Sequence, residues 1–159
     1  MASPVPAPAP PRYRAARALV LDGEGRVLLL RWIDPDDGRT VWFTPGGRIE
    51  AGELPAAAAL RELWEETGLA AAQVGPCLMR LRTRSPRALR DEHHFLVQAQ
   101  GPLGEPLLPD PGTAGRRWWT LSELEASREL FHPRNVAQLV RLALGGPPPE
   151  PLRVEYELE

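Results

Sequence analysis

The chain is short of several residue types, and each shortage argues against a class of protein. Its 159 residues contain one cysteine, Cys77, so no disulfide can form within the chain and a cysteine-based zinc site is not expected. No run approaches the roughly 18 apolar residues of a membrane span. The net charge of −2 indicates neither a membrane nor a specific nucleic-acid partner. The first residues, MASPVPAPAPPRYR, lack the apolar core of a secretory signal, so we expect a cytoplasmic location.

Lysine is absent as well, and all 19 basic residues are arginine. Arginine therefore fills the surface positions that lysine usually shares, which weakens the case for any single arginine as a phosphate ligand. The remaining composition, 43% hydrophobic and 25% charged, is ordinary for a soluble globular protein. A chain of this length fits one domain with its own core.

Proline and glycine divide the chain into three parts. Residues 1–11 are a Pro/Ala-rich segment expected to be flexible, residues 12–146 form the folded domain, and residues 147–159 are a Pro-rich extended tail. Strands are predicted at residues 14–21, 26–32, 41–43, 77–84, 93–100 and 116–120, and helices at 54–67, 121–124 and 133–144. Residues 44–47 are expected to form a turn, and residues 77–84 to alternate between two faces, with Leu78 and Met79 on opposite sides. Hairpins interspersed with helices predict an α+β fold with a mixed sheet.

The predicted helix over residues 54–67 carries the most informative side chains. Glu62, Glu65 and Glu66 have the i, i+3, i+4 spacing that places them on one helical face. The apolar stripe lies nearly opposite, so one face can pack on a sheet while the other presents carboxylates. Ala58 is expected among the carboxylates, and the stripe is expected to consist of Ala56, Leu60, Leu63 and Thr67, with Ala59 and Trp64 beside it. Like charges this close repel one another, and a hard cation such as Mg²⁺ is the usual partner of such a cluster.

The surrounding residues extend this cluster into a longer pattern. The sequence GRIEAGELPAAAALRELWEETGL, residues 47–69, has the spacing Gly-x5-Glu-x7-Arg-Glu-Leu-x-Glu-Glu-x-Gly-Leu. This pattern resembles the Nudix box, the signature of the Nudix hydrolase family, and the order of segments over residues 13–145 is similar too. The resemblance implies an α/β/α sandwich with a mixed sheet between helices. It also implies Mg²⁺- or Mn²⁺-dependent hydrolysis of a phosphoanhydride bond by attack of water on phosphorus.

The resemblance assigns catalytic roles to residues at and after the glycine turn. The Gly46 carbonyl, Glu65 and Glu66 are expected to bind the divalent metal, and Glu62 to be a further ligand or the general base. Some members of the family recruit another acid downstream. The candidates here are Glu92, Glu105 and Asp110.

Other positions of the pattern are expected to hold its shape. Arg61 orients the neighbouring catalytic glutamate and pairs with Glu53, while Gly47 and Gly68 shape the turn and the end of the helix. Outside the pattern, four side chains are candidates for contact with substrate, by stacking on a base or pairing with phosphate. They are Arg31, Trp32, Phe43 and Arg48.

The substrate within the family stays open. The tyrosine that marks dinucleoside-polyphosphate hydrolases is absent, and Pro86 is displaced from the position typical of ADP-ribose hydrolases. The remaining candidates are a nucleoside di- or triphosphate, or a nucleoside diphosphate derivative such as a nucleotide sugar. We expect the protein to be a monomer or a homodimer. The alternative is a nucleotide- or ADP-ribose-sensing module on the same fold, which the full set of carboxylates argues against. Isoprenoid diphosphate isomerisation needs an upstream cysteine, whereas Cys77 lies downstream.

Overall fold

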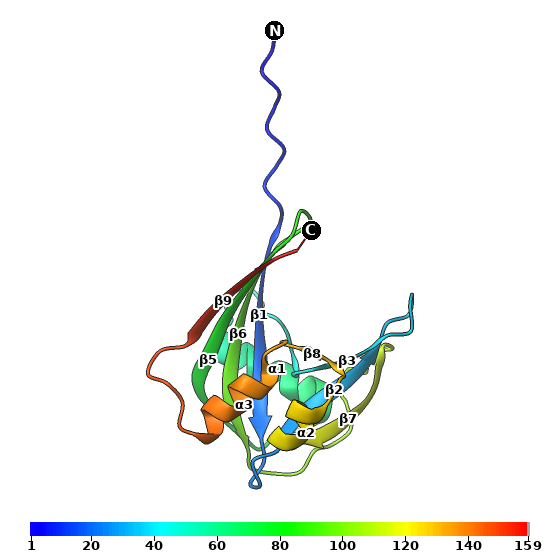
Figure 1. Cartoon of the computed structure of the whole chain (residues 1–159), viewed down its shortest axis with the longest axis vertical. Helices are drawn as coiled ribbons and strands as arrows, with labels where there is room; N and C mark the ends of the chain where they lie inside the picture. Colours follow the sequence, from blue (N-terminus) through cyan, green and yellow to red (C-terminus); the bar gives the residue numbers. More distant parts are fainter. Residues whose placement is uncertain (159) are drawn as a thin grey trace.

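One mixed sheet organises the chain, which we describe from a computed structural model covering residues 1–158 (Figure 1). The strands are β1 (Arg12–Leu21), β2 (Val27–Ile33), β3 (Thr40–Phe43), β4 (Gly46–Arg48), β5 (Ala72–Arg84), β6 (Leu89–Ala99), β7 (Thr113–Trp119), β8 (Leu130–His132) and β9 (Leu152–Glu157). The helices are α1 (Pro55–Thr67), α2 (Leu121–Ala126) and α3 (Val136–Leu144). None of these helices is long and apolar enough to cross a membrane.

The sheet runs in the order β8-β3-β2-β1-β6-β5-β9, with β4 paired to β1 and β7 paired to β2. Strands β1 and β6 are parallel, as are β3 with β8 and β5 with β9, whereas the remaining pairs are antiparallel. The mixed sheet predicted from the sequence is therefore confirmed.

Helices cover both faces of the sheet. Successive side chains of the central strand β1 point to opposite faces, and each set packs against a different helix layer. Ala18 and Val20 pack in a cluster with Leu63 of α1. Leu19 and Leu21 pack in a second cluster that includes residues of α2 and α3. Figure 1 shows α2 and α3 in front of the sheet and α1 behind it. This is the predicted layered arrangement of helices around a mixed sheet.

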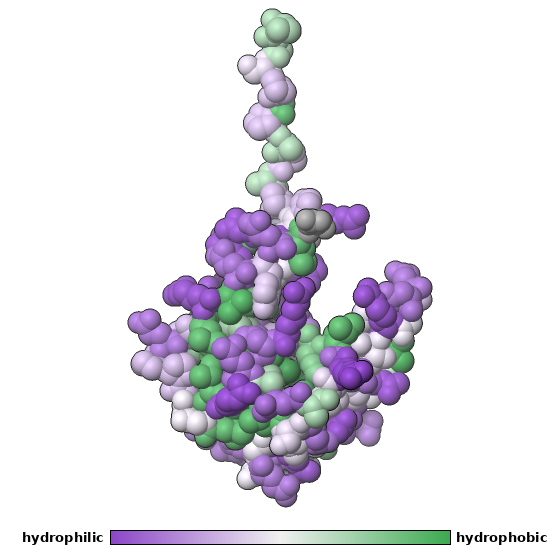
Figure 2. Space-filling model, viewed as in Figure 1, coloured by the Kyte–Doolittle hydropathy of each residue, from purple (hydrophilic) through white to green (hydrophobic). Residues whose placement is uncertain are grey.

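Both ends of the chain refine the expected organisation. Residues 1–11 are exposed and stand clear of the body of the molecule (Figure 2). The C-terminal segment is extended as predicted, but Leu152–Glu157 pairs with β5 and forms the edge strand β9. The segment thus contributes to the sheet, and the division of the chain at residues 11 and 146 stays a prediction.

Three local expectations differ from the structure. The predicted turn at residues 44–47 contains the start of β4, which pairs with β1. The expected alternation along β5 fails because register shifts on both sides of Cys77 leave Leu78 and Met79 both buried. Residues 130–132, not expected to be a strand, pair with β3 as β8. Strands β4 and β8 depend on pairing with strands that are not their neighbours in the sequence, and such pairing has no local sequence signal. The irregularity in β5 arises in its pairing with the next strand, β6.

Candidate active site

Helix α1 is delimited by residues whose backbone preferences suit its two ends. Pro55 occupies the first turn, where the missing N–H costs nothing. Gly68 ends the helix with φ of 68°, a left-handed conformation that favours glycine, and its N–H donates to the Trp64 carbonyl at 2.8 Å. A Cβ at Gly68 would also lie 2.6 Å from Gly104, so the end of α1 touches the loop before β7 directly.

The two faces of α1 are rotated relative to the sequence prediction. Ala58, expected among the carboxylates, is fully buried, whereas Trp64, expected beside the apolar stripe, is 47% exposed. The side of the helix that carries Ala58 faces β1, where Ala16 packs against it. The carboxylates that follow on this side therefore face the glycine turn and β1 and do not point away from the protein.

Arg61 ties the first half of the box together. Its Nε and Nη2 donate to the two carboxylate oxygens of Glu53 at 2.7 and 3.0 Å, and Nη2 also donates to the Arg48 carbonyl at 3.0 Å. Nη1 reaches Glu62 at 3.0 Å and Glu65 at 3.3 Å. The hydrogen bonds from Arg61 hold the pKa of Glu53 at about 2, far below its ordinary value. One guanidinium thus joins the loop before α1 to two glutamates of the helix, Glu62 and Glu65.

Glu66 has a different environment. Its carboxylate accepts one hydrogen bond from the Gly46 N–H at 3.2 Å. Burial, together with the negative charge of Glu62, raises the pKa of Glu66 to about 8. Gly47 permits this crowding, because a Cβ there would lie 2.5 Å from the Glu62 carboxyl carbon. The glycine turn and α1 therefore meet at the carboxylates of Glu62 and Glu66. The raised pKa of Glu66 shows that nearby positive charge does not fully balance its negative charge.

These carboxylates open into a cavity of about 630 Å³, within the usual size range of small-molecule sites. Its wall combines acids, arginines and apolar side chains, contributed by Arg17, Leu30, Phe43, Gly46, Glu62, Glu65, Glu66, Glu105, Pro106, Leu108, Pro109, Asp110, Thr113, Gly115 and Arg116. We call this space the carboxylate cavity.

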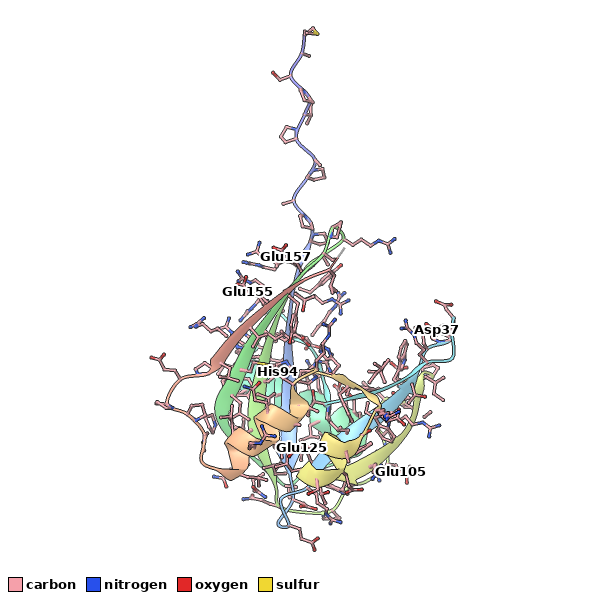
Figure 3. The ribbon with its side chains drawn as sticks, in the orientation of Figure 1. Asp37, His94, Glu105, Glu125, Glu155 and Glu157 are labelled. Atoms are coloured by element: carbon pink, nitrogen blue, oxygen red, sulfur yellow. The ribbon has the colours of Figure 1, made fainter. Side chains whose placement is uncertain are left out.

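The loop before β7 closes one side of the carboxylate cavity. Backbone N–H groups of Leu107 and Leu108 donate to the Glu65 carbonyl at 2.8 and 3.2 Å. Arg116 secures the loop with hydrogen bonds to the carbonyls of Gly104 at 2.6 Å and Thr67 at 3.2 Å. Figure 3 shows Glu105 beside β7, well away from Glu157 of β9. The acids of this loop are thereby brought to the cavity from far along the sequence.

A second polar cluster lies behind the glycine turn. Arg17 Nε donates to Glu92 at 2.6 Å, and its Nη1 donates to the Thr44 carbonyl at 2.8 Å. His132 Nε2 donates to the same Glu92 carboxylate, 3.1 Å from each oxygen. Burial alone would raise the pKa of Glu92, but the hydrogen bond from His132 and the charge of Arg17 hold that pKa well below its usual range. Nearby His94 (Figure 3) is neutral, because burial lowers its pKa to about 3.

The predicted candidates for the site fall into two groups. Phe43, Glu105 and Asp110 line the carboxylate cavity, in addition to the box glutamates and Gly46. The remaining candidates lie outside its wall. Arg48 stacks on the Tyr13 ring at 4.1 Å, and Glu92 is bound to Arg17 and His132. Arg31 and Trp32 sit on β2 and are likewise not part of the wall.

Arg17 and Arg116 belong to the cavity although sequence reasoning did not select either. The run AARALVL gives one signal in retrospect, since Arg17 is the one charged residue within this apolar part of β1. Its partner Glu92 and its neighbour Thr44 lie on other segments, so nothing local indicates what Arg17 binds.

The donor set of the cavity fits a hard divalent cation. Carboxylate and backbone oxygens are the ligands that Mg²⁺ prefers, and the raised pKa of Glu66 marks a place where added positive charge is stabilising. Within the described part of the chain, no three His, Cys, Asp or Glu side chains converge closely enough to form a metal site as they stand. Arg61 draws Glu62 and Glu65 toward itself, and the Gly46 N–H holds Glu66.

The sequence matches the NUDIX domain family over residues 11–140. The chain belongs to this family. Among curated relatives, Phosphatase NudJ of Escherichia coli (strain K12) is 43% identical over 54 residues. That stretch covers 34% of this chain and 34% of the relative, so the chain spans about a third of the length of the curated proteins it matches.

Solved structures support the Nudix fold over nearly the whole chain. The MutT protein from Methanosarcina mazei Go1 superposes with a TM-score of 0.69 and 19% identity, covering 88% of this chain and 100% of that one. An ADP-ribose pyrophosphatase from Streptococcus suis 89-1591 gives a TM-score of 0.61 and 19% identity, covering 91% and 98%. Identities this low establish the shared fold alone.

Proposed function

We propose that the protein is a metal-dependent hydrolase that cleaves a phosphoanhydride bond in a nucleoside diphosphate derivative by attack of water on phosphorus. The observation that carries the proposal is the convergence of Glu62, Glu65 and Glu66 with Gly46 on one cavity of about 630 Å³. A merely solvated acidic face would lie on open surface. Here Glu66 is buried enough to raise its pKa to about 8.

The site residues divide the work of such a reaction. When bound, a divalent cation supplies charge neutralisation at the phosphate oxygens and lowers the pKa of water. Glu65, Glu66 and the Gly46 carbonyl are the proposed ligands, and Glu62 is a ligand or accepts the proton from the attacking water. Arg61 holds Glu62 and Glu65 in place through Nη1. Glu105 and Asp110, on the loop before β7, also line the cavity and are alternative proton acceptors.

The shape of the cavity favours a substrate with both a charged and an apolar part. Leu30 and Phe43 offer an apolar wall suited to a nucleobase or ribose, while Arg17 and Arg116 add positive charge near the acids. The names of the relatives point the same way, because the superposable S. suis protein is called an ADP-ribose pyrophosphatase. We therefore expect a nucleoside diphosphate derivative in preference to a free nucleobase or a nucleic acid.

A substrate panel tests this proposal directly. The purified chain is incubated with nucleoside di- and triphosphates, ADP-ribose and nucleotide sugars, with Mg²⁺, with Mn²⁺ or with EDTA, and phosphate, pyrophosphate and nucleoside monophosphate are measured. We expect turnover of at least one diphosphate compound with metal and none with EDTA. Equal turnover in EDTA would overturn the metal dependence. Binding of a nucleotide without any turnover would favour the alternative, a sensing module on the same fold.

A further inference from the structure

Arg17 is the residue of the carboxylate cavity whose position is most completely specified by its surroundings. Its Cγ passes next to Gly46, where a Cβ would lie only 2.5 Å away. Its Nε is bound to Glu92 at 2.6 Å and its Nη1 to the Thr44 carbonyl at 2.8 Å. The arginine side chain is thereby fixed along its length while it still contributes to the cavity wall.

The two partners of Arg17, Glu92 and Thr44, are themselves held by hydrogen bonds with His132. The Glu92 side chain is only 5% exposed, and His132 Nε2 donates to it from β8 at 3.1 Å. Thr44 is fully buried, and its N–H donates to the His132 carbonyl at 3.1 Å. Three strands, β1, β6 and β8, therefore contribute to holding one guanidinium. Burying charged groups is costly, and an equally stable core does not need them.

The guanidinium of Arg17 keeps hydrogen-bonding capacity beyond its two bonds within the protein. The two hydrogen bonds use Nε and Nη1, which leaves Nη2 of the guanidinium as the nitrogen without an assigned partner. Arg17 lines the same cavity as Glu66, and its Cγ lies beside Gly46, whose N–H donates to the Glu66 carboxylate at 3.2 Å. A rigidly held guanidinium at this place suits a phosphate oxygen, because little conformational freedom remains to be lost on binding.

We propose that Arg17 is a substrate-binding residue of the carboxylate cavity, donating from its guanidinium to a phosphate oxygen of the substrate, and that Glu92 and His132 are positioning residues that hold it. This inference rests on the proposed function and extends it, because it assigns a phosphate ligand outside residues 47–69. Glu92 is then not the additional downstream acid considered from the sequence, since its carboxylate accepts hydrogen bonds from Arg17 and His132.

The test measures binding separately from turnover. The probe is adenosine 5′-(α,β-methylene)diphosphate with Mg²⁺, which carries the diphosphate group but resists cleavage between its phosphorus atoms, and its affinity is measured by titration calorimetry. The variant is the double substitution R17Q/E92Q, which removes both charges of the buried pair and leaves no unpaired charge. We expect about a tenfold or greater loss of affinity, as for a lost charge-assisted hydrogen bond. The matched control is R128Q, at an exposed arginine outside both polar clusters, and it should bind as the wild type does.

A second measurement needs no destabilising substitution. The side-chain ¹⁵N resonances of Arg17 are assigned in the wild-type protein by their loss in R17K, and the analogue is then added to saturation. A shift of the Arg17 resonances, with the Arg128 resonances unchanged, supports the proposal. Saturable binding without any shift at Arg17, or wild-type affinity in folded R17Q/E92Q, overturns it while leaving the hydrolase proposal intact. Absence of both analogue binding and hydrolysis in the wild type overturns the proposed function, and this inference with it.

The positioning role has its own readout. E92Q keeps the shape of the side chain and Arg17 itself, but removes the charge that fixes the guanidinium. In E92Q we expect KM to rise more than kcat falls. At His132 we expect H132A to raise KM in the same way, and H132Q, which can still donate to Glu92, to keep KM closer to that of the wild type. A fall in kcat with unchanged KM in E92Q would show instead that Glu92 acts in the chemical step.

Discussion

Glu53 and Glu66 are both glutamates of the 47–69 segment, but their surroundings give them opposite properties. Glu53 shares two hydrogen bonds with Arg61, which hold its pKa at about 2. Glu66 is buried beside Glu62 and has one backbone hydrogen bond, and its pKa is raised to about 8. The charge of Glu53 is thus balanced by an arginine of the protein, whereas the Glu66 carboxylate has no arginine hydrogen-bonded to it among the described residues.

The difference separates acids that maintain shape from acids that need a ligand. The Glu53–Arg61 pair is complete within the chain and also anchors the Arg48 carbonyl, so it closes the loop onto α1. The pair formed by Glu66 and Glu62 is incomplete. Glu62 accepts a hydrogen bond from Arg61, but Glu66 is buried beside this like charge and accepts only from the Gly46 N–H. Substitutions at the complete pair should therefore reduce stability, and substitutions at the incomplete one should reduce activity.

The largest expected effect is that of Glu66→Gln on the reaction. The amide keeps the size of the side chain but removes a proposed metal ligand, so we expect kcat/KM to fall roughly a thousandfold. The melting temperature should stay the same or rise, since a poorly compensated buried charge is removed. Both quantities are measured with Mg²⁺ against the control Glu129→Gln, at an exposed acid outside the site. A rate near that of the wild type would refute the assignment of Glu66.

Gly46 and Gly47 of the turn allow effects on stability and effects on rate to be compared at neighbouring positions. A Cβ at Gly47 would lie 2.5 Å from the end of the flexible Glu62 side chain, whereas one at Gly46 would lie 2.4 Å from the Ala16 backbone oxygen. Gly47→Ala can be accommodated by moving Glu62, so we expect about a hundredfold loss of rate with little loss of stability. Gly46→Ala must move backbone and should lower the free energy of unfolding by about 1–3 kcal/mol.

Steady-state kinetics and urea unfolding of these two alanine variants distinguish the effects. If Gly47→Ala unfolds as easily as Gly46→Ala but turns over at the wild-type rate, the position of Glu62 does not matter for the reaction. We expect Gly47→Ala to be the more stable of the two variants, with its loss seen mainly in the rate, and Gly46→Ala to be the less stable.

Sequence reasoning reached the part of the site that is local in the chain. The spacing of Glu62, Glu65 and Glu66 and the glycine that ends α1 are properties of consecutive turns of one helix, so a periodic pattern predicts them. The sheet could be predicted in outline, because six of its nine strands overlap segments with strand-like sequence patterns, whereas β4, β8 and β9 do not. The rotation of α1 that buries Ala58 could not, since it depends on the small residues of β1 across the interface.

The remaining part of the site is assembled from distant segments. Arg17 meets a glutamate 75 residues away, and Glu92 meets a histidine 40 residues away. Both contacts depend on the parallel pairings of β1 with β6 and of β3 with β8. The register of such pairings is set by the whole core, and β8 has only three residues to indicate it. The sequence therefore predicts the acids of the cavity better than the cations that border it.

Glu53→Gln should have a smaller effect on the rate than any change at the incomplete pair. It weakens the hold on Arg61, which still reaches Glu62 and Glu65, so we expect kcat/KM to fall by about tenfold. The melting temperature should fall by about 2 °C, because one bond of the loop closure loses its charge. Thermal unfolding and kinetics measured on the same preparation check both expectations. A thousandfold loss of rate would place Glu53 among the reacting groups.

The pH dependence of stability gives the smallest and most specific signal. The pKa of Glu53 is about 2 in the folded protein and has its ordinary value, 4.5, when Arg61 no longer binds it. A carboxyl group whose pKa is lowered by folding stabilises the folded state fully above the unfolded pKa, and this contribution is lost as the pH falls toward the folded pKa. The difference in melting temperature between wild type and Glu53→Gln should therefore be constant near neutral pH and shrink from about pH 4.5 to about pH 2. A difference that persists unchanged at pH 2.5 would mean that the pair stabilises the loop through packing, and that Arg61 does not distinguish the charged from the neutral carboxyl group.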